Sequence, residues 1–458
     1  MRARLLLLAA VLTAFGGSLV AGFHLDDYAI FSGPLLKSGH EWFEMWGWRQ
    51  PHPLTNLTFW LNDRVSGQDP LGYHVVNLLL HLGAVWLAYE CLRRLLPPAA
   101  ALLAAAIFAV HPLQAEAVNY VAMRGVMLAA LFCLAALLAW IEERPWLAVA
   151  AFAAALLADE QCASFPLILL ILRRPPAAPK QKVIAFGGML ALAVAAVARL
   201  SGNGQNYVLA LVSTCFLRFL RLLVLPWGFT VSPDAPEPWW LLIPALTVIA
   251  ALLVWGWRRR DLEGRYLLAG CLLLIPSYSA DPAADPRMYL PLFAFAAAAG
   301  LLLARIPIRQ VALGLVLVLV ALSVHRTYVW MSDERLWREA VNQAPDKAEP
   351  KIELAKSLRA ADALELLARA REQAPYNAEI PAEIGKVLLD ERQFDGALDE
   401  LSRAVALNPK NALAFNNRGV ALAALGQGPA ARADFEHALA LDPDLAEAGE
   451  NLKRLGAR

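Results

Sequence analysis

The chain has 458 residues, of which 59% are hydrophobic and only 18% are charged, and its mean hydropathy is +0.47. This composition excludes a string of ordinary soluble domains and predicts a polytopic membrane protein. The formal net charge is +1, so we expect no nucleic acid partner. The five cysteines contain no CxxC pair and no repeated spacing, which argues against a disulfide framework or a zinc site.

Residues 1–330 are apolar stretches separated by short loops, and many stretches approach the roughly 20 residues that cross a bilayer as a helix. Helices are expected because an open sheet edge cannot be hydrogen-bonded in lipid. The first stretch, preceded by Arg2 and Arg4, also has the pattern of a cleaved signal peptide. The predicted spans are residues 4–22, 72–92, 99–112, 124–141, 145–159, 161–172, 183–199, 239–257, 264–280, 288–304 and 308–330.

The distribution of Lys and Arg predicts the orientation in the membrane. The positive-inside rule places the basic clusters in the cytoplasm. The stretch 208–225 carries Arg218 and Arg221, so we interpret it as an interfacial or re-entrant helix and count about eleven spans. The N-terminus is then cytoplasmic and the C-terminus outside. Short loops and a high Ala, Arg and Leu content favour a bacterial inner membrane, with a periplasmic C-terminus.

After residue 330 the composition shifts to Ala, Glu, Arg and Leu, and Pro375, Pro409 and Pro443 are each separated by 34 residues. This is the period of tetratricopeptide repeats, which predicts an α-solenoid over residues 331–458. Such repeats bind protein on a concave face, although a spacer or cap is the simpler alternative. The candidate protein-binding residues are Phe415, Asn416 and Arg418.

Most polar residues of the first 330 fall on the predicted outer side. Asp26 and Asp27 follow the first span, where an ionisable pair is a functional candidate or a solvated loop pair. His74, Asn77 and His81 share one face of a predicted helix. That polar stripe is equally consistent with a ligand site and with hydrogen bonding between helices.

Two further residues precede the span at 288–304. Arg287 and Tyr289 lie at the predicted outer interface, where a guanidinium can bind a phosphate through paired hydrogen bonds. An arginine there can equally be a snorkelling anchor, which is the more common role for a single such residue.

The order of these motifs resembles a known family, the membrane O-mannosyltransferases that carry C-terminal tetratricopeptide repeats, within the GT-C class of glycosyltransferases. The matching sequence motifs, in family order, are HLDDYAIF, RQPHPLTNLTFWLN, GYHVVNLLLH, FAVHPLQAEAV and RMYLP, followed by the repeats. The resemblance implies a transmembrane GT-C-like domain over residues 1–330 and a repeat domain over residues 331–458.

The resemblance also implies a reaction. A sugar, mannose or another hexose, would pass from a polyprenyl phosphate to a Ser or Thr hydroxyl of an exported or membrane protein. Asp26 and Asp27 match the family's acidic pair, in which one carboxylate acts as the base, and which of the two does so stays open. A positioned carboxylate can take the hydroxyl proton as the bond forms, and a single base without a carboxylate nucleophile implies inversion.

The remaining site residues follow from the same resemblance. Arg287, Tyr289 and Arg124 would bind the donor phosphate or lipid, because a phosphate leaving group needs positive charge. No cofactor is implied, since the lipid-linked sugar is a substrate, and no metal ligand is predicted. Relatives typically show Lys-Glu where this chain has Asp159-Glu160. The supporting or substrate-binding residues would be His111, Glu116, Glu160, Arg49 and His74.

The sequence therefore supports two hypotheses about function, one an enzyme and the other a binding protein. The first is a membrane-embedded protein O-glycosyltransferase whose repeats recruit the acceptor. The alternative is a non-catalytic membrane scaffold whose repeats assemble an exported protein complex. A non-protein acceptor is also compatible, whereas a transporter has little support because midspan charge pairs and broken-helix repeats are not evident.

Overall fold

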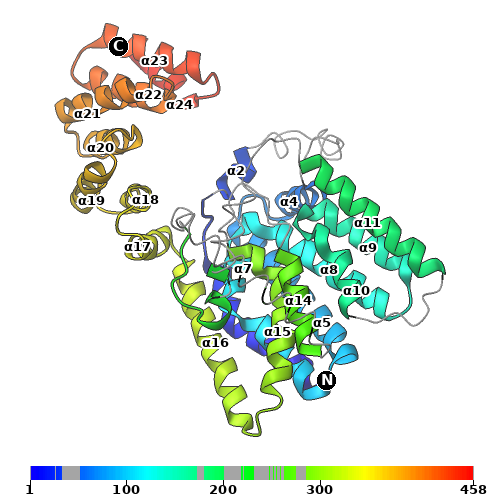
Figure 1. Ribbon diagram of the computed structural model, residues 1–458. Helices are drawn as coiled ribbons and strands as arrows, with labels where there is room; N and C mark the ends of the chain where they lie inside the picture. Colours follow the sequence, from blue (N-terminus) through cyan, green and yellow to red (C-terminus); the bar gives the residue numbers. More distant parts are fainter. Residues whose placement is uncertain are drawn as a thin grey trace. The chain divides into compact units, whose positions relative to one another are not determined.

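The computed structural model is built from helices, and no strand occurs among the residues that it describes (Figure 1). This confirms the predicted all-α class. The chain divides into two compact units, one formed by Met1–Phe229 and Pro233–Ser332 and the other by Thr230–Ser232 and Asp333–Arg458. The described residues are 2–25, 27–32, 52–172, 180–200, 218–219, 221–231, 247, 251, 254, 258, 262–274 and 285–456.

The helices of the first unit follow the predicted apolar stretches closely. Prolines mark the beginning of several of them, because proline is tolerated where the first helical N–H needs no partner. The α-helices are α1 (Arg2–Phe15), α2 (Asp27–Ser32), α4 (Pro53–Ser66), α5 (Pro70–Leu95), α6 (Pro98–Val110), α7 (Ala115–Asn119), α8 (Arg124–Ile141), α9 (Pro145–Ala158), α10 (Phe165–Leu172), α11 (Lys180–Leu200), α14 (Leu262–Leu274), α15 (Tyr289–Leu303) and α16 (Arg309–Val329).

Short 3₁₀ helices connect several of these elements. They are η1 (Gly16–Val20), η3 (Pro112–Gln114), η4 (Val121–Met123), η5 (Glu160–Ser164) and η8 (Asp285–Met288).

Four helical segments in the described part of the chain are long and apolar enough to cross a membrane, and a fifth is formed if the bent pair Pro98–Val110 and Pro112–Asn119 is one span. Three shorter apolar helices accompany them, at Pro145–Ala158, Glu160–Leu172 and Tyr289–Leu303. The polytopic helical character is therefore confirmed, whereas the count of eleven spans stays a prediction. The predicted re-entrant stretch 208–225 and the span 239–257 lie mostly outside the described residues.

Helix α4 occupies part of the segment that we predicted as loop. Its polar sequence hides the helix, since after Pro53 at its beginning only Thr55, Phe59 and Asn62, at helical spacing, turn inward and are buried. Thr55 Oγ1 donates to the carbonyl oxygen of Ala158 at 2.8 Å. This hydrogen bond fixes the beginning of α4 against the end of α9.

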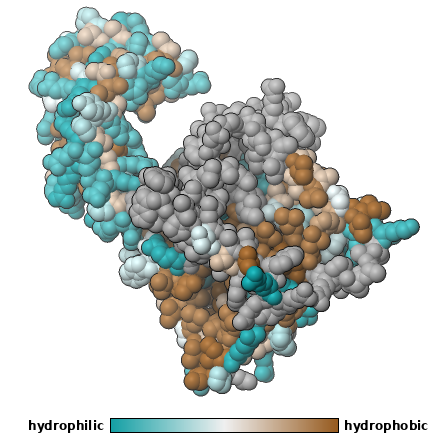
Figure 2. Space-filling view, viewed as in Figure 1, coloured by the Kyte–Doolittle hydropathy of each residue, from teal (hydrophilic) through white to brown (hydrophobic). Residues whose placement is uncertain are grey.

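The outer surface of the first unit has the apolar character expected of a lipid-facing protein. On α16, Val311, Leu313 and Leu317 are exposed, while Ser323 turns inward and is buried. Figure 2 shows hydrophobic residues covering much of the described surface of this unit. In lipid such an exposed apolar surface is favourable, whereas a soluble monomer rarely exposes one this large.

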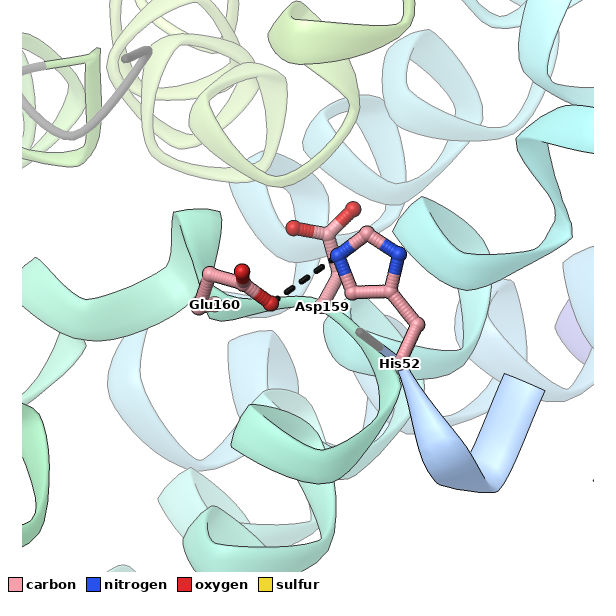
Figure 3. Close-up of side chains that lie close together, drawn as sticks. All are labelled: His52, Asp159 and Glu160. Atoms are coloured by element: carbon pink, nitrogen blue, oxygen red, sulfur yellow. Dashed lines mark ion pairs between the residues drawn. The ribbon is translucent and has the colours of Figure 1, made fainter. Parts of the chain in front are cut away.

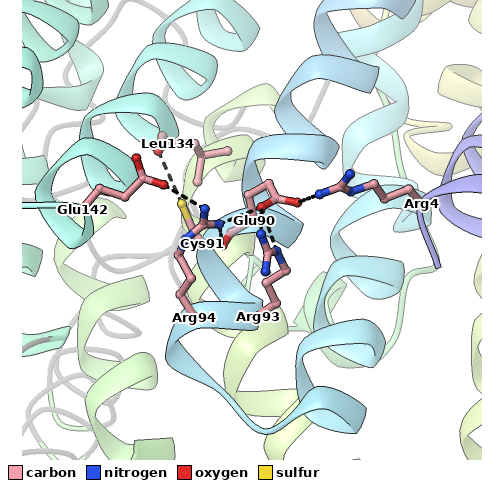
Figure 4. Close-up of polar contacts among 7 residues, drawn as sticks. All are labelled: Arg4, Glu90, Cys91, Arg93, Arg94, Leu134 and Glu142. Atoms are coloured by element: carbon pink, nitrogen blue, oxygen red, sulfur yellow. Dashed lines mark hydrogen bonds and ion pairs between the residues drawn. The ribbon is translucent and has the colours of Figure 1, made fainter. Parts of the chain in front are cut away.

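A cluster of charged residues gathers at the end of α5 (Figure 4). Glu90, almost fully buried, forms ion pairs with Arg4, Arg93 and Arg94, and Arg94 also pairs with Glu142 at 2.8 Å. Arg4 belongs to one basic cluster, and Arg93 and Arg94 belong to another. The positive-inside rule places both clusters on one side of the membrane, and they are neighbours in the fold.

The second unit consists of eight helices among its described residues, which pair in the antiparallel manner of tetratricopeptide repeats. They are α17 (Asp333–Gln343), α18 (Glu349–Ala355), α19 (Ala360–Gln373), α20 (Glu379–Asp390), α21 (Phe394–Leu407), α22 (Ala412–Ala424), α23 (Gly428–Leu441) and α24 (Ala446–Gly456). The small residues lie where the helices touch, as the 34-residue period predicts. A Cβ atom added at Gly419 would lie 2.7 Å from the ring of Phe435.

We expect the substitution Gly385→Ala to destabilise the repeats by about 1–2 kcal/mol, because overpacking outweighs the gain in helix propensity. Its Cβ would lie 2.4 Å from Cγ of Leu401, which is fully buried. Gly396→Ala is the matched control, since its Cβ would meet Leu388 at 3.4 Å, an ordinary contact. Hydrogen–deuterium exchange of α20 and α21 in the full chain measures both, and equal protection in the two variants would contradict the packing argument.

Candidate functional site

Asp27 begins α2 and is fully buried. Its Oδ2 accepts a hydrogen bond from the backbone N–H of His24 at 3.0 Å, and its Oδ1 accepts one from the N–H of Ala122 at 2.7 Å. Burial raises the pKa of Asp27 to about 6, although the hydrogen bonds from His24 and Ala122 work in the opposite direction. The carboxylate form therefore predominates at neutral pH and ties α2 to the loop before α8.

Asp26 and Arg49, two of the residues that we predicted from the sequence, lie outside the described residues. Of the predicted acidic pair, the contacts given above are therefore those of Asp27.

Arg124 begins α8 and is fully buried. Its guanidinium donates to the side-chain oxygens of Asn77 and Asn62, both at 2.9 Å, and to the carbonyl oxygens of Thr58 at 3.3 Å and Tyr73 at 3.2 Å. These contacts join α4, α5 and α8. They occupy four of the five N–H donors of this buried guanidinium, so its role in donor binding stays a prediction.

The polar stripe of α5 faces the interior of the unit, where His74, Asn77 and His81 are fully buried. His81 Nε2 lies 3.0 Å from the carbonyl oxygen of Ala109, and its Nδ1 lies 2.6 Å from the hydroxyl of Tyr289. Since a carbonyl can only accept, Nε2 carries the proton and Nδ1 accepts from Tyr289. The stripe therefore serves contacts between helices.

Tyr289 and Arg287 lie in different surroundings, because Tyr289 is hydrogen-bonded to His81. The Tyr289 ring is buried against Phe108 and His81, so its hydroxyl points into the helical core. Arg287, in η8, instead lines a small cavity. The two residues that we predicted to bind the donor together thus face different surroundings.

The other supporting residues are placed as follows. His74 Nε2 lies 3.1 Å from the carbonyl oxygen of Gly22, which joins α5 to the segment after the first span. His111 accepts from the N–H of Leu113 at 3.2 Å and so caps η3. Glu116, in α7, is buried. His74 therefore lies beside the segment that follows the first span, and His111 and Glu116 lie in the loop before α8.

The cavity that Arg287 lines measures about 30 Å³ and brings η8 beside the junction of α9 and η5. Asp159 lines its other side, and at 6% exposure it is buried as deeply as Arg287 at 7%. Opposite charges therefore face one space of the size of an ion or a water molecule. The remaining lining residues are Val126, Ala129, Ala130, Gln161, Cys162, Leu273, Leu290 and Pro291.

His52 is the site residue that sequence reasoning missed. It directly precedes α4, and its Nε2 lies 2.9 Å from Oε2 of Glu160, a predicted site residue in η5 (Figure 3). The PHP motif that contains His52 marked only the resemblance, since nothing in the spacing brings residue 52 to residue 160. The Thr55–Ala158 hydrogen bond described above is what brings them together.

In the repeats, the three predicted protein-binding residues make contacts within their own unit. Phe415 is 8% exposed and Asn416 is 2% exposed. Arg418 forms two hydrogen bonds of 2.7 Å to the carboxylate of Asp434, which raise the pKa of Arg418. These contacts hold α22 against α23, and a direct role in binding a partner stays a prediction.

The segments around residues 24–27, 52–55, 111–124, 158–162 and 285–291 meet in one region of the first unit, since α2 contacts η4, α4 contacts α9, and η8 contacts η3 and α7. Fold and site together define a helical membrane unit with a polar, charged region, followed by tetratricopeptide repeats. The family model described as TPR repeat matches residues 385–426.

The chain is similar in sequence to protein O-mannosyl-transferases. It is 42% identical over 112 residues to Tmtc1 of Drosophila melanogaster, covering 24% of this chain and 12% of that protein. It is 36% identical over 169 residues to human TMTC4, covering 31% and 23%. It is 31% identical over 153 residues to mouse TMTC3, covering 30% and 17%. The chain thus spans less than a quarter of the length of each of these relatives.

Solved structures of tetratricopeptide domains also match the chain. The first TPR domain of human RPAP3 is 26% identical, with 25% of this chain and 92% of that chain covered and a TM-score of 0.24. The TPR domain of Arabidopsis OM64 is 27% identical, with 24% and 95% covered and a TM-score of 0.24.

Proposed function

We propose that this chain is an integral membrane glycosyltransferase that transfers mannose or another hexose from a polyprenyl phosphate to Ser or Thr hydroxyls of exported proteins, with inversion. The observation that carries the proposal is the meeting of the Asp27 segment, Glu160 and Arg287 in one region of a chain similar to protein O-mannosyl-transferases.

In this proposal Asp26 is the base. Both oxygens of Asp27 already accept backbone N–H bonds, and its side chain is fully buried, so it is poorly placed to take a proton from an acceptor hydroxyl. Asp27 instead ties the beginning of α2 to the loop before α8. The neighbouring carboxylate of Asp26 would take the hydroxyl proton while the new glycosidic bond forms at the anomeric carbon.

Arg287 supplies the positive charge for the departing polyprenyl phosphate. The leaving group is already a weak base, so stabilising its charge matters more than protonating it. Arg287 is buried and faces a small cavity, which places its charge where solvent screens it little. The fixed region around η8 and η5 holds that charge in place.

The repeats, in this proposal, recruit or orient the protein acceptor on the outer side of the membrane, in a bacterium the periplasm. The gathering of Arg4, Arg93 and Arg94 around Glu90 supports placing both basic clusters on one side, the cytoplasmic one. The polar region would then be open to the other side.

The experiment is glycopeptide mass spectrometry of exported and membrane proteins from host cells with the chain, without it, and with the Asp26→Asn/Asp27→Asn variant. We expect a hexose mass on Ser or Thr that requires both the chain and the acidic pair. If the three samples match while partner proteins still co-purify through residues 340–458, the enzyme proposal fails and a scaffold explains the chain better.

A further inference from the structure

His52, Asp159 and Glu160 form a compact group of side chains from two segments that are distant in sequence (Figure 3). One nitrogen of His52 and one carboxylate oxygen of each acid all lie within 4.8 Å of one another. One imidazole and two carboxylates form a mixed nitrogen and oxygen donor set. Such a set is typical of divalent metal sites.

The fold holds the two segments that carry the three side chains in place. Asp159 Oδ1 accepts from the backbone N–H of Gln161 at 2.8 Å and caps η5. The Thr55–Ala158 hydrogen bond fixes the other segment beside it. A Cβ added to Gly125 would lie 3.1 Å from the carbonyl oxygen of Ala158, so α8 packs closely against the same junction. The three donors therefore need little rearrangement to converge on an ion.

Asp159 also connects the group to a space that can hold a ligand. It is 6% exposed, and the hydrogen bond from Gln161 engages its Oδ1. The residue lines the cavity of about 30 Å³ that Arg287 also lines. That volume exceeds the roughly 10–15 Å³ needed by one water-sized occupant, so an ion and a coordinated oxygen fit beside the carboxylate.

The charges of the group favour a cation. Two carboxylates lie near a single imidazole, which is neutral or carries at most one positive charge. The His52–Glu160 contact of 2.9 Å compensates one acid at most. Asp159 interacts with His52 and, across the cavity, with the charge of Arg287. A divalent ion would complete the charge balance of this buried acid.

We propose that His52, Asp159 and Glu160 bind a divalent first-row metal cation, Zn²⁺ or Mn²⁺, with an open coordination position toward the cavity. Mg²⁺ and Ca²⁺ fit less well, because both favour sites made only of oxygen ligands. On the condition that the proposed function holds, this cation and Arg287 together would face the phosphate of the donor. The binding site itself does not depend on that function.

The test uses the full chain, purified in detergent and treated with chelator, with Mn²⁺ alone as the probe. Electron paramagnetic resonance measures free Mn²⁺ during titration, and electron spin-echo modulation detects a coordinated imidazole nitrogen. We expect one Mn²⁺ per chain, a nitrogen signal that disappears in His52→Ala, binding weakened at least tenfold in Glu160→Gln, and displacement by Zn²⁺. Glu142→Gln is the control, since that acid pairs with Arg94 elsewhere in the same unit.

Thermal unfolding of each variant in the absence of metal separates lost binding from lost fold. Absence of stoichiometric binding in the folded parent chain, or binding that is unchanged in both His52→Ala and Glu160→Gln, would overturn the proposal. Sugar transfer that persists in a chain without bound metal would reject the role of the cation toward the donor phosphate and leave the proposed function standing. Metal binding in a chain without transfer activity would support the metal site and count against the proposed function.

Discussion

Replacing Asp26 by Asn is expected to lower the rate of sugar transfer by a factor of about 10² to 10⁴, the usual contribution of a positioned general base. The fold should be unaffected, because the contacts that anchor this turn belong to Asp27. The measurement is transfer of labelled sugar from a polyprenyl phosphate to acceptor peptide by purified chain, together with its thermal unfolding.

Asp27→Asn is the informative comparison. It is expected to lower transfer and also to loosen the loop before α8, because an amide group would face the N–H of His24 or of Ala122 and could not accept from it. Hydrogen exchange in residues 118–124 reports that loosening. An Asp26→Asn chain with full activity, or one that loosens this loop as much as Asp27→Asn, would show that the two roles have been assigned wrongly.

The second large effect concerns stability. Arg124→Ala is expected to destabilise the first unit by about 3–5 kcal/mol, because it leaves buried acceptors without their donors. The acceptors are the side-chain oxygens of Asn77 and Asn62 and the carbonyl oxygens of Thr58 and Tyr73. Arg124→Lys should recover only part of the loss, since an ammonium cannot reproduce the planar arrangement of donors.

Thermal unfolding in detergent, followed by tryptophan fluorescence, measures this loss. Arg64→Ala is the matched control, because Arg64 is exposed and lies over the ring of Trp60 at 5.2 Å, a contact worth about 0.5–1 kcal/mol. If the two variants unfold at the same temperature, the network around Arg124 does not hold the helices together.

Most of the helices could be predicted because apolar length is a local property. The predicted span 72–92 lies within α5, and 308–330 coincides closely with α16. The helix α4 was missed because it carries polar residues on its outward face, so that neither length nor hydropathy marks it. The repeats were predictable for a related reason: a 34-residue period places Gly385 and Gly419 where helices touch.

The candidate site was predictable only in part. Position after the first span identified Asp26 and Asp27, but only hydrogen bonds distinguish them. Position at an interface suggested that Arg287 and Tyr289 act together, whereas packing turns Tyr289 toward His81. The family resemblance suggested that Arg124 binds the donor phosphate, whereas tertiary contacts surround its guanidinium with protein acceptors.

By itself, the amino-acid sequence determined the membrane character, the all-helical class, the repeats and the resemblance to O-mannosyltransferases, because composition, period and motif order are properties of the chain alone. Only the tertiary structure decided which polar groups meet. His52 lies beside Glu160, and Asp159 faces Arg287 across a cavity. The physical reason is that these contacts depend on how α4, α9 and η8 pack, and packing between distant segments leaves no mark in local spacing.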